Sequence, residues 1–391
     1  MTRECLAMLW SRIIISVGEN YFKLESYIDA FLKGKDCMFE AHEKTCGGYI
    51  SGETKVGITL RLLAGGDIND LGVIFDITAN HCTIIMLDVL KHWINETDIG
   101  KIKMYDYLDD DEALKKCSEG FSIRSNGILK GAIGALDGWL VRIQRPSFFR
   151  DGILNVTSFF SRKDFYALNV QVMVDDKKRV LWVSYSHKGG SHDSSCFRAT
   201  RLYDYLKKNS SKLLEKGYFI LGDSAYCIES FLLPPYDNAD PRSEDDDFNF
   251  YHSSARITVE CAFGEIDLRW GIFWKRLNFS LDNSAIIIEG AMRLHNYLVD
   301  FRESMKDDLL VTYERNVFQE DIANSLAVPI QTGSDLGRPQ GNISNDERMN
   351  RLKGMAIRDG IRQDLADQDM HRRTNHWKCD TSSHAYCVTD V

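Results

Sequence analysis

Three acidic residues stand out because each lies within or beside an apolar stretch. Asp137 lies in the run AIGALDGWLVRI, Asp223 directly follows YFILG, and Glu260 lies in the helical segment 254–270. Each acid alone is typical of a turn or a cap. An unpaired buried carboxylate is costly, however, and the three together at two strand ends and on one helix favour a shared Mg²⁺ or Mn²⁺ site. Two such ions would activate a water and stabilise the leaving oxygen in phosphodiester cleavage.

Two further residues are candidates for supporting roles. Arg256 lies one helical turn before Glu260, on the same face. It either orients the Glu260 carboxylate or a scissile phosphate, or it forms a structural ion pair, and the sequence leaves both alternatives open. Asp193 precedes a helical stripe. We interpret it as a helix cap in preference to a residue that supports the metal ligands.

The elements that must position these residues follow from apolar patterning. Alternating and short apolar runs predict an α/β fold in which helices flank a sheet of mixed direction, with an acidic loop at 239–250. The strands are predicted at 132–143, 165–174, 180–186, 218–222 and 231–233. The helices are predicted at 194–208, 254–270, 284–303 and 346–369.

Two apolar stripes near the N-terminus, at 67–75 and 80–93, flank a short turn. They predict two steeply crossing helices of the helix-turn-helix kind, although a plain helical subdomain has the same pattern. The second helix does not offer a strongly basic surface. The residues expected to be buried between the two helices are Ile74, Phe75, Ile85 and Val89.

Charge and composition exclude several classes of function. The 391 residues carry a net charge of −9, which by itself argues against nucleic acid as a partner. Residues 136–235, however, hold 15 Lys and Arg against 10 Asp and Glu, and some of these cations could follow a phosphate backbone. No apolar run approaches the ~18 residues of a membrane span. P-loop, dinucleotide and G-x-S-x-G motifs are absent from the sequence. The His and Cys residues at 371–387 lack a standard zinc spacing.

Five sequence blocks occur in an order that resembles PIF/Harbinger-type DDE transposases, which are DDE superfamily endonucleases with an RNase H-like fold. The resemblance covers about 55–300, and GALDG keeps the Asp-Gly pair of the more usual GAIDG. It implies that Asp137, Asp223 and Glu260 are the metal-binding catalytic triad. The blocks are GALDGWLVRI, FYALNVQVMVDD, GGSHDSSCFRATRL, GDSAYCIESFLLPPY and FNFYHSSARITVECAFGEIDLRWGIF.

The resemblance also implies a domain organisation and a function. We expect a metal-dependent endonuclease and transposase that cuts double-stranded DNA at transposon terminal repeats and joins the ends to target DNA. We further expect it to act in the nucleus, with a Myb/SANT-like accessory protein and as a homo-oligomer. The alternative is a domesticated, non-catalytic DNA- or protein-binding protein. The expected parts are a helical N-terminal segment (1–52), a helix-turn-helix-like region (53–100), a connector (101–131), an RNase H-like nuclease domain (132–303) and a polar, partly disordered tail (304–391).

Overall fold

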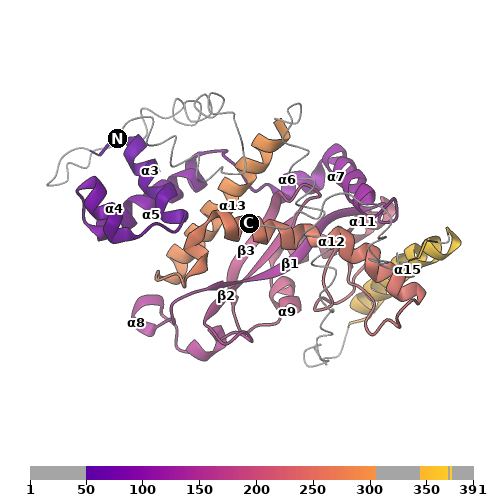
Figure 1. Cartoon of the computed structure of the whole chain (residues 1–391). Helices are drawn as coiled ribbons and strands as arrows, with labels where there is room; N and C mark the ends of the chain where they lie inside the picture. Colours follow the sequence, from indigo (N-terminus) through magenta and orange to yellow (C-terminus); the bar gives the residue numbers. More distant parts are fainter. Residues whose placement is uncertain (1–49, 305–343, 369, 372–391) are drawn as a thin grey trace, which may run out of the picture.

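The core of the protein is a single five-stranded sheet. The computed structural model describes residues 50–304, 344–368 and 370–371 (Figure 1). The strand order is β3-β2-β1-β4-β5; β1, β2 and β3 pair antiparallel, and β4 and β5 run parallel to β1. The predicted mixed sheet is therefore confirmed. The strands are β1 (Ala132–Arg142), β2 (Ala167–Val174), β3 (Val180–Lys188), β4 (Phe219–Leu221) and β5 (Leu232–Leu233).

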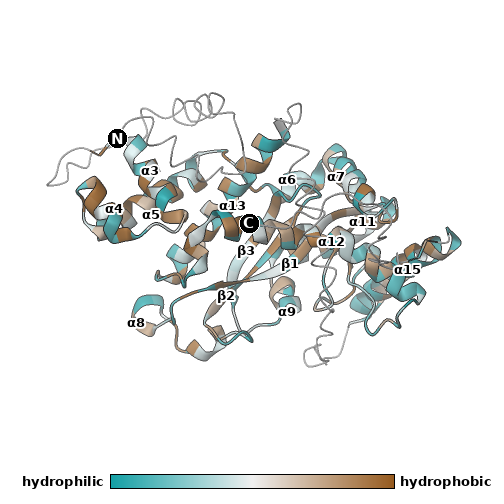
Figure 2. Cartoon of the chain, in the orientation of Figure 1, coloured by the Kyte–Doolittle hydropathy of each residue, from teal (hydrophilic) through white to brown (hydrophobic). Residues whose placement is uncertain are grey.

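Helices cover both faces of this sheet. Buried side chains of α12 and α13 pack on one face, and those of α6, α9, α10 and α11 pack on the other. Figure 2 shows hydrophobic segments in the central strands and in α4, whereas α7 is largely hydrophilic. The helices in the sheet region are α6 (Met104–Asp109), α7 (Asp111–Arg124), α8 (Phe148–Asp151), α9 (Asp193–Arg198), α10 (Arg201–Lys208), α11 (Ser210–Glu215), α12 (Glu244–Arg269) and α13 (Leu281–Ser304), with short 3₁₀ turns at Val156–Phe159 and Gly271–Trp274.

Two predicted elements differ from the structure for local reasons. The helix expected at 194–208 is divided into α9 and α10, because the Thr200 side chain accepts the backbone N–H of Tyr203 and begins a new helix. From Glu244 on, the acidic stretch expected to be a loop at 239–250 belongs to α12. Ser243 caps this helix, and four acidic residues fill its first turn, where the positive end of the helix dipole favours negative charge.

The helical region before the sheet consists of α3 (Gly52–Leu63), α4 (Ile68–Phe75) and α5 (Ala79–Glu96). As predicted, α4 and α5 are separate helices; they are bent by 96° relative to each other. Ile85 and Val89 are buried as expected, but Ile74 is 68% exposed, so that prediction is wrong. The inner face of this two-turn helix consists of Ile68, Leu71 and Phe75, and Ile74 falls outside this stripe.

The length and apolarity of the described helices can be set against those of a membrane span. Within the described ranges, no single helix is long and apolar enough to cross a membrane, and only the bent pair of α4 and α5 reaches that length and apolarity together.

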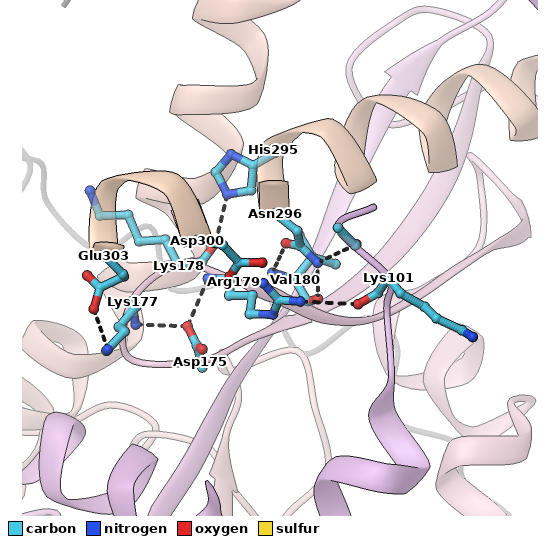
Figure 3. Close-up of polar contacts among 11 residues, drawn as sticks. Lys101, Asp175, Lys177, Lys178, Arg179, Val180, His295, Asn296, Asp300 and Glu303 are labelled. Carbon is cyan, nitrogen blue, oxygen red and sulfur yellow. Dashed lines mark hydrogen bonds and ion pairs between the residues drawn. The ribbon is translucent and has the colours of Figure 1, made fainter. Parts of the chain in front are cut away.

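The β2–β3 hairpin is anchored to α13 by polar contacts (Figure 3). Asn296 accepts the backbone N–H of Val180 at 2.7 Å and donates to the Val180 carbonyl at 2.8 Å. His295 Nε2 donates to the Lys178 carbonyl at 2.8 Å. The turn therefore has a fixed position against the helix that covers the sheet.

The helix α15 (Asn345–Asp367) confirms the helix predicted at 346–369, and it lies beside α12 and β5 (Figure 1). The Arg358 guanidinium lies 3.8 Å from the centroid of the Tyr236 ring and donates to the Pro235 carbonyl at 3.1 Å. Arg362 donates to Asp245 of α12 at 2.7 Å. Residues 1–49 and most of the His and Cys residues at 371–387 lie outside the described residues.

Candidate active site

Asp137 and Asp223 occupy matched positions on adjacent parallel strands. Ala135 of β1 lies opposite Leu221 of β4, and each Asp follows two residues later on its own chain segment. Asp137 Oδ1 accepts the backbone N–H of Gly138 at 2.7 Å, and Asp223 Oδ1 accepts that of Ala225 at 2.9 Å. The parallel register therefore brings both carboxylates to the same edge region of the sheet.

The helix α12 brings Arg256 and Glu260 to this pair of carboxylates. Arg256 Nη1 donates to Asp137 Oδ2 at 2.9 Å, and its Nη2 donates to Glu260 Oε1. The Arg256 side chain is 17% exposed and that of Glu260 44%. Asp137 and Glu260 thus share one guanidinium, whose charge also acts to lower the pKa of Asp223. Arg256 forms the structural i,i+4 ion pair with Glu260, which was one of the two alternatives, and it also contacts Asp137 on β1.

Burial and nearby negative charge make the carboxyl groups of Asp137 and Asp223 hard to ionise. Burial, followed by the charge of Asp223, raises the pKa of Asp137 to about 7, while Arg256 acts in the opposite direction. Burial also raises the pKa of Asp223; here Arg256 and Arg162 oppose the shift and Asp193 adds to it. The cluster therefore carries negative charge that the protein's own cations balance only in part.

Asp193 is not the N-cap of α9, so the predicted capping role is wrong. The N-cap residue of α9 is His192, which makes no side-chain capping bond. Asp193 Oδ1 instead accepts the side-chain amides of Asn169 at 2.7 Å and Gln171 at 3.0 Å. Asn169 and Gln171 of β2 supply two hydrogen-bond donors to one oxygen of Asp193. This carboxylate therefore binds to β2 and does not cap the backbone at the start of α9.

Sequence reasoning missed four residues that hold Asp193 in place: Gly138, Asn169, Gln171 and Tyr226. The Tyr226 hydroxyl donates to Gln171 Oε1 at 2.7 Å. A Cβ on Gly138 would lie 2.2 Å from Asp193 Oδ1, so only glycine fits opposite Gln171. The available signal was the pair of polar residues at alternating positions in the otherwise apolar strand ALNVQVMV.

The donor chemistry of the site fits a divalent cation, but its present arrangement is held by Arg256. Mg²⁺ and Mn²⁺ prefer carboxylate oxygens, and Asp137 and Asp223 supply them side by side. Among the described residues, no group of three or more His, Cys, Asp and Glu side chains is arranged to hold a metal ion. The guanidinium between Asp137 and Glu260 explains why the third carboxylate does not complete such a group.

Some Lys and Arg residues between Asp137 and Asp223 form ion pairs, whereas others form none among the described residues. Lys177, Lys178 and Arg179 form ion pairs with Glu303, Glu265 and Asp300, and the first and third of these contacts are drawn in Figure 3. Arg150 and Arg198 are paired as well. These five cations have structural partners. Other cations, for which no ion pair occurs in the described part of the chain, are Arg142, Arg145, Arg162, Lys163 and Lys188.

Comparisons with known proteins agree with the chemistry of this site. Residues 136–296 match the family described as DDE superfamily endonuclease, which covers less than half of the chain and includes all three acids. Protein ALP1-like from Arabidopsis thaliana is 26% identical over 156 residues, or 37% of this chain and 38% of that protein. The matched part therefore spans little more than a third of the relative's length. No solved structure matches the chain.

Proposed function

We propose that the chain is a metal-dependent DNA endonuclease and transposase of the PIF/Harbinger type, built on an RNase H-like core. The observation that supports this most strongly is the register of β1 and β4, which sets Asp137 and Asp223 side by side, with Glu260 delivered by α12. The match to the DDE superfamily endonuclease family points to the same chemistry.

The residues of the site have distinct roles in this proposal. Asp137, Asp223 and Glu260 would hold Mg²⁺ or Mn²⁺, which when bound activates a water and stabilises the leaving oxygen. Arg256 fixes the side chains of Asp137 and Glu260 through its two hydrogen bonds. Asp193 sets the negative potential beside Asp223, since its charge raises the Asp223 pKa.

The substrate and partners belong to the same proposal. The substrate is double-stranded DNA at transposon terminal repeats, cut and joined in the nucleus by a homo-oligomer with a Myb/SANT-like accessory protein. Residues 52–96 hold 3 Lys and Arg against 6 Asp and Glu. Because phosphate binding depends on Lys and Arg, α4 and α5 would need such an accessory protein, or the unpaired cations of the sheet domain, for DNA affinity.

A second candidate function rests on the position of Arg256. Its ion pairs to Asp137 and Glu260 occupy the space where a third carboxylate ligand would complete a metal site. A domesticated protein that binds DNA or protein without cutting would keep this arrangement as a structural ion-pair network. The two candidates differ in whether a divalent cation displaces the guanidinium.

The deciding experiment is Asp223→Asn, compared with Asp267→Asn as a control carboxylate on α12, outside the candidate site. Nicking of terminal-repeat DNA with Mn²⁺ should be lost in Asp223→Asn and kept in the control. Mn²⁺ should raise the melting temperature of the unchanged protein and of the control, but not of Asp223→Asn. If Asp223→Asn cuts at the original rate, Asp223 is not a metal ligand. If the unchanged protein neither cuts nor responds to Mn²⁺, the non-catalytic function is supported.

A further inference from the structure

The connection between β1 and β2, residues 143–166, presents large apolar side chains to solvent. Phe149 is 99% exposed, Leu154 is 86% exposed, and Phe148 and Phe160 are also exposed. Exposed apolar residues in such a group commonly mark a surface that binds something. We call residues 143–166 the β1–β2 loop.

Polar contacts hold the base of the β1–β2 loop in one conformation. The side chain of Asp151 is fully buried; it pairs with Arg150 at 2.8 Å and accepts the backbone N–H groups of Ser147 at 2.9 Å and Leu281 at 3.1 Å. Arg150 also donates to Gln144 at 2.8 Å. The helix α8, which carries Phe148 and Phe149, is thereby fixed to α13, so the exposed rings are presented from a structured base.

Four cations lie in the loop or at its start and make no ion pair within the described residues. Arg142 and Arg145 stack over Phe165 and Tyr166, with guanidinium carbons 4.5 and 6.0 Å from the ring centroids. Arg162 and Lys163 are exposed nearby in sequence. The loop has two acidic residues, Asp151, which Arg150 neutralises, and Asp164. The loop surface therefore combines aromatic rings with an excess of positive charge.

The β1–β2 loop extends from the candidate active site. Arg142 lies five residues beyond Asp137 on the same strand, or about 16 Å at ~3.3 Å per residue. Gly190, three residues before Asp193, donates its N–H to the Ser158 carbonyl of the loop at 3.0 Å. A DNA strand that passes both Asp137 and Arg142 would span about five nucleotides between them, at ~3.4 Å each.

We propose that the β1–β2 loop is a DNA-binding element in which Arg142, Arg145, Arg162 and Lys163 contact backbone phosphates and Phe149 stacks on or between bases a few nucleotides from the cut. Apolar side chains such as Phe unstack base steps when they insert, and aromatic rings stack on bases of any sequence. Phosphates satisfy the unpaired cations, whereas a protein surface would need a matching acidic patch. This inference rests on the proposed function, because DNA is taken as the ligand of the Asp137–Asp223 site.

The test uses the full chain in EDTA, so that cutting plays no part in the result. The variants are Phe149→Ala and Arg145→Gln, and the matched control is Leu268→Ala, which removes a 78% exposed side chain from α12. The probes are terminal-repeat duplexes with 2-aminopurine placed at successive positions. Salt dependence of binding and the mass of the protein in solution are measured in parallel.

Phe149→Ala should weaken DNA binding on the order of tenfold and abolish a 2-aminopurine fluorescence increase confined to one or two positions. Arg145→Gln should lower the salt slope by about one, while Phe149→Ala leaves it unchanged. Unchanged binding and fluorescence in Phe149→Ala would overturn the proposal. So would a loss of self-association in that variant without any change in DNA binding, which would identify a protein contact. A chain that shows these effects but never nicks DNA would refute the nuclease proposal alone.

Discussion

Replacing Arg256 with methionine tests how the site balances its charge. The substitution keeps an unbranched side chain of similar reach but removes the guanidinium that lies between Asp137 and Glu260. Even with this guanidinium in place, burial and the charge of Asp223 hold the pKa of Asp137 at about 7. Without it, we expect that pKa to rise further.

The magnitude follows from proton linkage. The pKa of Asp137 is raised from 3.8, its value in the unfolded chain. The stabilisation that the protonated Asp137 carboxyl provides is therefore fully present below pH 3.8. It is lost as the pH rises to about 7, and above that pH no more of it is lost. In Arg256→Met we expect the Asp137 carboxyl to stay protonated in the folded state. The free energy of unfolding therefore continues to fall above pH 7, by about 1.4 kcal/mol per pH unit. The variant should be less stable than the unchanged protein by about 1.4 kcal/mol more at pH 8, and about 2.7 kcal/mol more at pH 9, than at pH 6.

Urea unfolding in EDTA at pH 6, 7, 8 and 9 measures this difference. The control is Arg302→Met, which breaks the 2.9 Å ion pair with Glu265. Neighbouring cations lower the Glu265 pKa to about 2 against the effect of burial, so the control's loss should be constant across this range. A loss in Arg256→Met that is also constant from pH 6 to 9 would refute the reasoning. At pH 8, Mn²⁺ should stabilise Arg256→Met more than the unchanged protein, because the ion replaces the missing cation.

Three further substitutions test the packing around the site. Gly138→Ala should lower stability by about 1–3 kcal/mol, because its Cβ would lie 2.2 Å from Asp193 Oδ1; an unchanged melting temperature would contradict this. Tyr226→Phe leaves the Gln171 amide oxygen without its donor and should cost about 1–3 kcal/mol in urea unfolding, whereas a neutral effect would show that water replaces the hydroxyl. Asn296→Ala removes three hydrogen bonds to backbone groups and should cost at least as much by the same measurement; a loss below that of Tyr226→Phe would show that the hairpin is anchored elsewhere.

The sheet could be predicted from sequence because its strands carry strong periodic or continuous apolar patterns. The run YFILG follows a helix, so a parallel strand could be predicted, but chain order did not determine that β1 is its neighbour, on which the convergence of Asp137 and Asp223 depends. The contact of Arg256 with Asp137 could not be predicted, because it depends on the angle at which α12 crosses the sheet. Spacing along one helix shows only the i,i+4 partner.

The incorrect predictions for single residues have different physical causes. Asp193 stands where an N-cap is common, but the amides of Asn169 and Gln171 bind it from β2. Ile74 is apolar, yet a helix of two turns buries only one narrow stripe, and Ile74 lies outside it. The partners that decide the position of Asp193 are distant in sequence, whereas the exposure of Ile74 follows from the helix itself.

The placement of α15 has a consequence for how the chain folds during synthesis. The edge strand β5 and the neighbouring Tyr236 are covered by a helix that begins only at Asn345. A nascent chain that has already formed the sheet therefore presents an open strand edge until that late helix leaves the ribosome, and such edges pair readily with other chains. The edge is thus covered only after α15 has been synthesised, and ribosomes that stall between β5 and α15 would release a core prone to aggregate.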